Sequence, residues 1–503
     1  MKGLAMCGFV CLWNIDDEAL AARMLARIAH RGPDEQKIIR LPGAILAHAR
    51  LAIIGPEDGT QPLVSGDRAL VVNGEIYNHA DLRKIAGPEK FATHSDSETI
   101  MHMMTDDAPR WIAKLDGMFA FVLLLPGRLI AARDPLGIKP LYKARMQGGL
   151  AFASEVKAFD GERVDHIEAV KPGSLWDSRD GERQWHRMPS GQAEPEAGLD
   201  EEKTAAELLL VFEAAVHKWM VADVELGAFL SGGLDSSAVA AVAAREMARS
   251  GMRLKTFAVG TKGSPDLVAA ARVAAHIGSE HFERVFTPED LIDAMPDVIS
   301  AMESADVDLV PSALPTHIVS VLARQYVKAV LTGEGADELF AGYRYHHDYA
   351  GKNRALADEL TRSLGTMHNI NLQRVDRITM ALGLEGRTPF LDRDLIAFAQ
   401  TIPASLKMKV NADGSTTEKW IFRKAVAGLL PDDIVWRTKA QFDEGSGSID
   451  ALRVALSGLT GKPAPVSRDD QAACFRAILE SRFIDPALIL SQAGTWTAAR
   501  VMV

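Results

Sequence analysis

Three short stretches of the sequence carry residue types that could do chemistry. The first is MCGF at 6–9: if the chain started at Met6 and lost it, Cys7 would carry a free α-amine. A thiolate is a strong nucleophile, and an α-amine with an ordinary pKa of about 7.7–8.0 could serve as its base near neutral pH. The other two stretches, LSGGLDSS at 230–237 and LTGEGADELF at 331–340, each combine glycines with acidic residues after an apolar run.

The stretch at 230–237 has the features of a phosphate-binding turn. It lies between an apolar run and an Ala-rich helical pattern, so backbone amides and a helix N-terminus would face an anion. Gly232 and Gly233 would let the backbone approach closely. Asp235 would repel a bare phosphate, which predicts a Mg²⁺ ion between them. The run matches neither the P-loop nor G-x-G-x-x-G, and a serine-capped glycine turn is the alternative for SGG alone.

The stretch at 331–340 places Glu334, Asp337 and Glu338 directly after the apolar run AVL. An isolated acidic cluster in a loop is usually a solvated turn. Two such loops, each following a buried strand of one parallel sheet, would instead meet at the carboxyl edge of that sheet. The two stretches together predict one site.

The elements that must position these residues differ between the two parts of the chain. Up to about residue 186, short apolar runs end in turn residues, which is typical of a β-rich domain. After a polar linker at 188–203, apolar strands alternate with long helical patterns, which predicts an α/β domain with a parallel sheet. From 456 onward we expect a helical tail.

Composition sets outer limits on function. The 503 residues are 47% hydrophobic and carry a net charge of −11, which argues against nucleic acid or an anionic membrane as the main partner. Three cysteines give no disulfide framework, and Cys11 and Cys474 read as core residues. No signal peptide or membrane-spanning run is visible, so we expect a cytoplasmic protein with no membrane partner.

Nine runs in the first part occur in a fixed order and resemble the class II glutamine amidotransferase domain. The resemblance implies an αββα N-terminal-nucleophile sandwich in which Cys7 attacks the glutamine amide. It implies that Asn73 and Gly74 supply the oxyanion donors and that Asn73 also binds glutamine. Glutamine is further held by Arg50 on its carboxylate and by Glu75 and Asp96 on its ammonium. The runs are CGF (7–9), HRGPD (30–34), HARLAII (48–54), QPL (61–63), NGEIYN (73–78), SDSE (95–98), LDGMFAF (115–121), RDPLGIKPLY (133–142) and FASEVKA (152–158).

The second part resembles the PP-motif of the ATP pyrophosphatases. With FAVG (257–260), SPDL (264–267), PFLD (389–392), TEKWIFRKA (417–425) and WRTKAQFDEGSG (436–447), residues 6–450 resemble the glutamine-dependent asparagine synthetases. This implies ATP, aspartate and glutamine as substrates, Mg²⁺ on Asp235 and Asp337, charge stabilisation by Lys439, and Glu334 assisting ammonia attack. The implied ATP-binding residues are Leu230, Ser231, Gly232, Gly233, Asp235, Ser236, Ser237, Val259, Gly333 and Glu334.

The resemblance also divides the chain and leaves its start open. We expect a leader or mis-assigned start at 1–6, a glutaminase domain at 7–187, a linker at 188–203, a synthetase domain at 204–455 and the tail at 456–503. Cys7 would become N-terminal either through translation from Met6, which we favour, or through removal of six residues. A homodimer is a family-based expectation.

One departure keeps alternative functions open. Many members carry a T-I-R-A-S run beside the aspartate pocket, whereas this chain has ADVDLVPSALPTH at 305–317, with Pro311 where the arginine would stand. Arginine is a natural carboxylate clamp, so a related amidotransferase acting on another carboxylate is the first alternative. A dead glutamine- or nucleotide-binding regulator is the second, although Asp235, Glu334 and Lys439 argue against it. A β-lactam-forming relative would not need the retained glutaminase residues.

Overall fold

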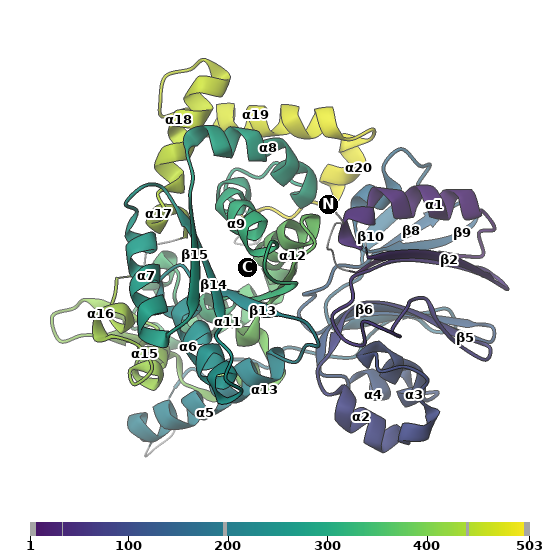
Figure 1. The fold of residues 1–503 in the computed structure, drawn as a ribbon, viewed down its shortest axis with the longest axis horizontal. Helices are drawn as coiled ribbons and strands as arrows, with labels where there is room; N and C mark the ends of the chain where they lie inside the picture. Colours follow the sequence, from purple (N-terminus) through teal and green to yellow (C-terminus); the bar gives the residue numbers. More distant parts are fainter. Residues whose placement is uncertain (1–6, 33, 195–198, 439–441, 497–503) are drawn as a thin grey trace.

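The chain forms an all-antiparallel β unit followed by a parallel α/β unit (Figure 1). The computed structural model describes residues 7–32, 34–194, 199–438 and 442–496. The expected α/β multidomain class is confirmed, with the αββα sandwich first and the parallel-sheet unit second. No helix in these described stretches is long and apolar enough to cross a membrane.

The first unit stacks two six-stranded antiparallel sheets face to face. Apolar side chains such as Phe9, Cys11, Leu46, Val71 and Val122 fill the space between them. One sheet has the order β10-β8-β9-β1-β3-β2 and consists of β1 (Gly8–Trp13), β2 (Glu35–Leu41), β3 (Ala44–Arg50), β8 (Tyr142–Met146), β9 (Gly149–Ala153) and β10 (His166–Ala169). The other has the order β12-β11-β7-β6-β5-β4 and consists of β4 (Leu63–Ser65), β5 (Arg68–Ile76), β6 (Gly117–Leu125), β7 (Arg128–Arg133), β11 (Ser174–Asp177) and β12 (Gly181–Gln184).

Helices cover the outer faces of both sheets, which completes four layers (Figure 1). Helix α1 (Glu18–Arg27) buries Leu20, Met24 and Leu25 against the first sheet. Apolar residues of α3 and α4 pack on the second sheet with Leu82 of α2. Their bounds are α2 (His79–Ala86), α3 (Thr99–Met103) and α4 (Ala108–Ile112). The alternating side chains of the strands therefore serve two cores, one between the sheets and one beneath the helices.

The second unit is built on a five-stranded parallel sheet of order β15-β14-β13-β16-β17. The chain passes from β13 to β14 on one side and returns to β16 on the other, so the strand order reverses at β13. Ligands of open α/β sheets bind at such a switch point, beyond the carboxyl ends of the strands. The strands are β13 (Leu226–Phe229), β14 (Lys255–Gly260), β15 (Glu280–Val285), β16 (Ala329–Leu331) and β17 (Glu385–Arg387).

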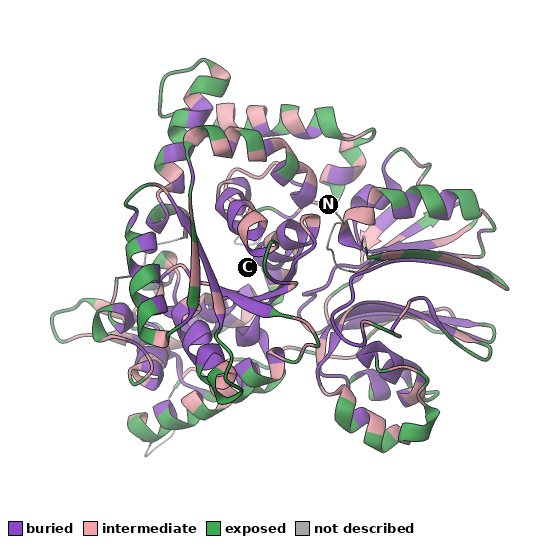
Figure 2. Ribbon diagram, viewed as in Figure 1, coloured by how far each residue is buried: buried purple, intermediate pink, exposed green. Residues whose placement is uncertain are grey.

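In the parallel sheet, β13, β14, β16 and β17 are largely buried on both faces, whereas the edge strand β15 is intermediate to exposed (Figure 2). Ala258 contributes to a core shared with α5, α6 and α7, whereas its neighbours Phe257 and Val259 contribute to a core shared with α8, α9 and α12. The helices are α5 (Glu201–Trp219), α6 (Leu234–Arg249), α7 (Pro265–Ile277), α8 (Pro288–Met302), α9 (Leu309–Ala323) and α12 (Asn371–Ala381).

The remaining elements surround this sheet. The tail continues as helices, but its first helix, α18, begins at Ser448, so the expected boundary at 455/456 falls inside a helix. The bounds are α10 (Ala336–Phe340), α11 (Asn353–Thr366), α13 (Arg393–Thr401), α14 (Ala404–Lys407), β18 (Met408–Val410), β19 (Thr416–Glu418), α15 (Trp420–Val426), α16 (Asp432–Val435), α17 (Phe442–Gly445), α18 (Ser448–Thr460), α19 (Arg468–Arg482) and α20 (Pro486–Ser491).

A buried charged seam joins the two units. Arg31 of the first unit contacts Glu155 at 2.5 Å and Asp376 of α12 at 2.9 Å, and all three side chains are buried. Arg377, also on α12, contacts Glu155 at 3.0 Å and Glu303 at 3.1 Å. Buried ions are tolerated when each has several partners, which these have. The seam therefore fixes α12 against the first unit.

Candidate active sites

Cys7 lies at the start of β1, where three neighbours hold it. Its thiol donates to the Leu51 carbonyl at 3.5 Å, and Arg31 Nε donates to the Cys7 carbonyl at 3.1 Å. In the orientation that satisfies its side-chain amide, Asn73 donates to the same carbonyl at 3.0 Å and accepts from Arg31 at 3.3 Å. Burial raises the pKa of the Cys7 thiol to about 12, so the thiol is protonated at neutral pH. Catalysis here requires a base next to the sulfur.

Gly74 and Arg50 are fixed by close backbone contacts. Gly74 has φ +135°, and a Cβ at this position would lie 1.9 Å from the Met118 carbonyl oxygen, so only glycine fits in β5 here. Arg50, at the end of β3, donates to the Gly55 carbonyl at 2.6 Å and to the Pro56 carbonyl at 3.1 Å. These bonds hold its guanidinium in one place, which suits a carboxylate clamp.

Glu75 and Asp96 form a buried acidic pair. Asp96 accepts a hydrogen bond from the Ile76 amide at 2.6 Å, and burial raises its pKa to about 6. Burial, with Asp96 nearby, raises the pKa of Glu75 well above its usual range, and Glu75 Oε2 has no hydrogen-bond partner within the described part of the chain. A bound ammonium group would satisfy both carboxylates.

The phosphate turn lies between β13 and the N-terminus of α6. Gly232 has φ +72°, and a Cβ there would lie 2.5 Å from the Ala269 side chain. Ser231 Oγ and Ser236 Oγ are 3.0 Å apart, and the Ser231 amide donates to Ser236 Oγ at 3.2 Å. The turn is therefore closed by its own serines.

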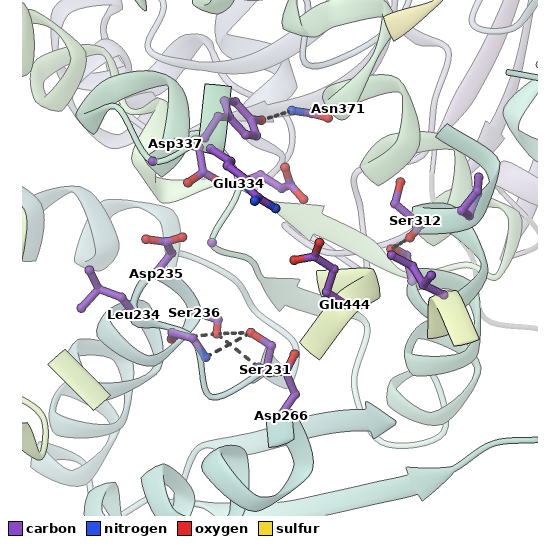
Figure 3. Close-up of a pocket in the computed structure, with 18 of the residues that line it drawn as sticks. Ser231, Leu234, Asp235, Ser236, Asp266, Ser312, Glu334, Asp337, Asn371 and Glu444 are labelled. Carbon is purple, nitrogen blue, oxygen red and sulfur yellow. Dashed lines mark hydrogen bonds between the residues drawn. The ribbon is translucent and has the colours of Figure 1, made fainter. Parts of the chain in front are cut away.

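The acidic loop after β16 touches the phosphate turn. A Cβ on Gly333 would lie 2.9 Å from the Ser236 amide nitrogen, so the two backbones are in contact. Both loops face one cavity of about 1930 Å³ (Figure 3). The expected residues that line it are Leu230, Ser231, Gly233, Asp235, Ser236, Val259, Gly333, Glu334 and Asp337.

Two of the expected synthetase residues in the described ranges are not among those that line the cavity. Gly232 packs against α7, and Ser237 is fully buried in the first turn of α6. Their neighbours Ser231 and Ser236 face the cavity instead. Lys439 lies outside the described residues.

A lysine that the sequence analysis did not single out connects the two carboxylates. Lys419 Nζ lies 2.7 and 2.6 Å from the Asp235 carboxylate oxygens and 2.6 Å from Asp337 Oδ1. The carboxylates of Asp235 and Asp337 thus share one positively charged group. Their oxygen atoms are also suitable ligands for a divalent cation. Mg²⁺ commonly takes one or two carboxylates with the rest of its ligands from water and phosphates. No group of three or more His, Cys, Asp or Glu side chains that could hold a metal ion occurs in the described ranges.

An arginine lies beside the Pro311 departure. Arg374 of α12 donates to Ser312 Oγ of α9 at 3.0 Å and forms an ion pair with Glu334. All of these residues, with Pro311, line the same cavity. A lone arginine in a helical pattern carries no local signal of a site, so the sequence analysis did not find it. The Lys419 signal was present in TEKWIFRKA, but the lysine itself was not assigned.

The fold and the two sites define an amidotransferase unit of the N-terminal-nucleophile type. It is joined to a parallel α/β unit with a cavity of the kind that binds nucleotides. A family model described as "Glutamine amidotransferase domain" matches residues 6–172, and one described as "Asparagine synthase" matches 207–358 and 349–462. The chain belongs to the family of the glutamine-hydrolysing asparagine synthetases.

Two relatives of similar sequence agree with this assignment. The asparagine synthetase [glutamine-hydrolyzing] of Asparagus officinalis is 39% identical over 473 residues, covering 89% of this chain and 79% of that protein. The corresponding enzyme 3 of Arabidopsis thaliana is 38% identical, covering 89% and 81%. A solved glutamine phosphoribosylpyrophosphate amidotransferase from B. subtilis is 17% identical, with a TM-score of 0.33, over 56% of this chain and 81% of that one.

Proposed function

We propose that this protein is an asparagine synthetase that hydrolyses glutamine, adenylates the side-chain carboxylate of aspartate with ATP, and transfers ammonia to it. The observation that carries the proposal is the pairing of two chemistries in one chain. Cys7 lies beside Asn73, Glu75 and Arg50, and a cavity at the carboxyl edge of a parallel sheet is lined by the glycine-serine turn and by paired carboxylates.

In the first half-reaction, the thiolate of Cys7 attacks the glutamine amide carbon. The α-amine of Cys7 takes the thiol proton and passes a proton to the departing ammonia, which leaves a thioester that water hydrolyses to glutamate. The Asn73 side chain and the Gly74 amide stabilise the oxyanion. Arg50 holds the α-carboxylate, and the Glu75–Asp96 pair holds the ammonium.

In the second half-reaction, an aspartate side-chain oxygen attacks the α-phosphorus of ATP, forming aspartyl-AMP and releasing pyrophosphate. Ser231, Ser236 and the N-terminus of α6 bind the phosphates. Mg²⁺ held by Asp235 and Asp337 would neutralise the pyrophosphate, and Lys439 would stabilise charge during adenylation. Ammonia then displaces AMP, while Glu334 accepts a proton from the attacking nitrogen.

Arg374 supports a carboxylate acceptor despite the absence of the usual arginine at position 311. Its guanidinium donates a hydrogen bond to Ser312, the neighbour of Pro311 on α9, and forms an ion pair with Glu334. A planar guanidinium can bind an α-carboxylate through two parallel hydrogen bonds. We therefore place the α-carboxylate of aspartate on Arg374.

The same proposal assigns a role to each part of the chain. The glutaminase domain spans 7–187, the linker 188–203, the synthetase domain 204–455 and the tail 456–503, with residues 1–6 removed from the working enzyme or never translated. A cytoplasmic homodimer is the assembly we propose.

Product analysis tests the function directly. The protein is incubated with Mg-ATP and aspartate, with either glutamine or ammonium chloride as the nitrogen donor. Asparagine, AMP and pyrophosphate are expected from both mixtures. If the glutamine mixture hydrolyses glutamine but neither mixture forms asparagine, aspartate is not the acceptor and another carboxylate is favoured. Ligand binding without any turnover would favour the regulator.

A further inference from the structure

The described part of the tail reaches the synthetase cavity. The asparagine synthase match stops at residue 462, yet Arg468, Gln471 and Trp496 line the cavity. These residues come from α19 and from the segment after α20. The tail therefore contributes surface to a site whose other walls come from residues 229–456.

The tail is anchored to both units before it arrives there. Arg468 forms an ion pair with Asp308 at 2.9 Å in the α/β unit. Further along, the amides of Ile484 and Asp485 donate to Asp160 of the first unit at 3.0 and 2.7 Å. Phe475, Leu479 and Ile489 are buried in a core that both units share. Figure 1 shows α19 and α20, in yellow, crossing from one unit toward the other.

Close contacts fix the last described turn of the chain. A Cβ on Gly494 would lie 2.0 Å from the Asn369 carbonyl oxygen, so the backbone of the tail rests directly on the loop before α12. Trp496 also lies beside Asp306, whose carboxylate accepts from the Asp308 and Leu309 amides at 2.8 and 2.9 Å at the start of α9.

The indole ring of Trp496 then packs at one end of the cavity. Its centroid lies 5.6 Å from that of Tyr343, with the rings at 77°. Tyr343 donates its hydroxyl proton to Glu338 at 2.6 Å, and Asn371 donates to the Tyr343 oxygen at 2.6 Å. Asn371 lies one helical turn before Arg374. The indole is therefore joined to the helix that carries Arg374 through Tyr343 and Asn371.

We infer that Trp496 is a specificity residue that closes the acceptor end of the cavity and limits the acceptor to a short amino dicarboxylate. This rests on the proposed function. Trp496 and Arg374 line one cavity and are connected through Tyr343 and Asn371, so an acid that is bound on Arg374 and longer by one methylene would meet the ring. Such a difference of one methylene can discriminate by about 10- to 200-fold.

The test compares four substitutions in the full-length protein. Trp496→Ala removes the wall, Trp496→Phe keeps an aromatic ring, and Gly494→Ala displaces the tail without removing the ring. Gly458→Ala in α18 is the matched control, because a Cβ there meets nothing within 4 Å. Pyrophosphate release is measured with ammonium as nitrogen donor, giving kcat and KM for aspartate, for glutamate and for ATP. Glutaminase activity and melting temperature report folding.

For Trp496→Ala and Gly494→Ala we expect the aspartate KM to rise about tenfold, which corresponds to about 1.4 kcal/mol, and the preference for aspartate over glutamate to fall by a similar factor. The KM for ATP should stay unchanged, and Trp496→Phe and Gly458→Ala should resemble the parent. Unchanged aspartate KM and selectivity in Trp496→Ala would overturn the inference, as would equal rises in the aspartate and ATP KM values. If Trp496→Ala does not fold, the Gly494→Ala result decides. A parent protein that makes no asparagine would instead refute the proposed function.

Discussion

The two active sites of this protein handle charge in opposite ways. In the proposed glutaminase site, Glu75 and Asp96 are buried together, and burial raises the pKa values of both carboxyl groups. In the synthetase site, Lys419 already bridges Asp235 and Asp337. The difference follows from the ligands: one site binds a single amino acid with its own ammonium, whereas the other must accept a polyphosphate with its counter-ion.

The sites also differ in how the chain builds them, and a single helix connects them. The glutaminase residues come from positions 7–96, in or near β1, β3 and β5. The synthetase cavity draws on residues from 229 to 496. Helix α12 contacts both sites: Arg374 pairs with Glu334, and Asp376 pairs with Arg31, which holds the Cys7 carbonyl. A change in either site therefore bears directly on this helix.

The largest effect should come from the nucleophile. Cys7→Ala is expected to lower glutamine-dependent synthesis by roughly 10³-fold or more while sparing synthesis from ammonium, because only the first site uses the thiol. Asparagine formation with each donor is the measurement, and Cys474→Ala is the matched control for loss of a thiol. Equal loss with both donors would refute the division of labour.

The second-largest effect should come from loss of a carboxylate beside the phosphate-binding turn. Asp235→Asn should reduce pyrophosphate release by roughly 10²- to 10³-fold with either nitrogen donor, since a preorganised electrostatic contact is lost. Glutamine hydrolysis should continue. The exposed Asp413→Asn serves as control, and normal pyrophosphate release from Asp235→Asn would place the phosphate site elsewhere.

The buried charged seam should lose stability when one of its charged side chains is removed. Asp376→Ala removes one of two buried carboxylate partners from Arg31, which keeps Glu155, and from Lys139, which keeps Glu385. Breaking a buried pair costs about 3–5 kcal/mol, and we expect a loss at the lower end of that range because each cation retains one partner. Urea unfolding should show this loss, accompanied by lower glutaminase activity. Asp358→Ala removes an exposed partner of Arg354 and should cost less than about 1 kcal/mol. Equal stability of the two variants would show that the seam does not hold the units together.

Substitutions of Arg374 should affect binding of the acceptor but not binding of ATP. Hydrogen bonds to a charged group contribute about 1.5–3 kcal/mol, so Arg374→Gln should raise the aspartate KM about 10- to 100-fold. The ATP KM should change little. Arg374→Lys keeps the charge without the planar fork and should recover only part of the loss. An aspartate KM that is unaffected in both variants would remove Arg374 from the acceptor site.

The smallest effect is a pH dependence of the glutaminase site. We propose that the ionised form of Asp96 binds the ammonium, and its raised pKa of about 6 means that it is neutralised at a higher pH than an exposed aspartate. The KM for glutamine should therefore rise as the pH falls below about 6, by about tenfold for one further unit. Synthesis from ammonium should not share this rise. Asp96→Asn should flatten the profile, and an unchanged profile would contradict the role.

These comparisons also separate what could be predicted from the sequence and what could not. The turn at 230–237 and the loop at 331–340 were placed together correctly, because both follow strands of one parallel sheet. The orientation within the turn was not predictable, since Ser237 points into the core once α6 begins. Arg374 and Asp376 gave no local signal, because their roles depend on folding: Asp376 meets Arg31 across 345 positions. Trp496 lies in a tail without any recognised motif.

Transfer of nitrogen between the two sites tests the central claim most directly. The protein is supplied with Mg-ATP, aspartate and amide-¹⁵N glutamine in the presence of an equal concentration of unlabelled ammonium. If the two sites act as one enzyme, asparagine will carry predominantly ¹⁵N. Asparagine that contains mostly unlabelled nitrogen, while glutamine is hydrolysed at an undiminished rate, would contradict the account and show two activities that share only a chain.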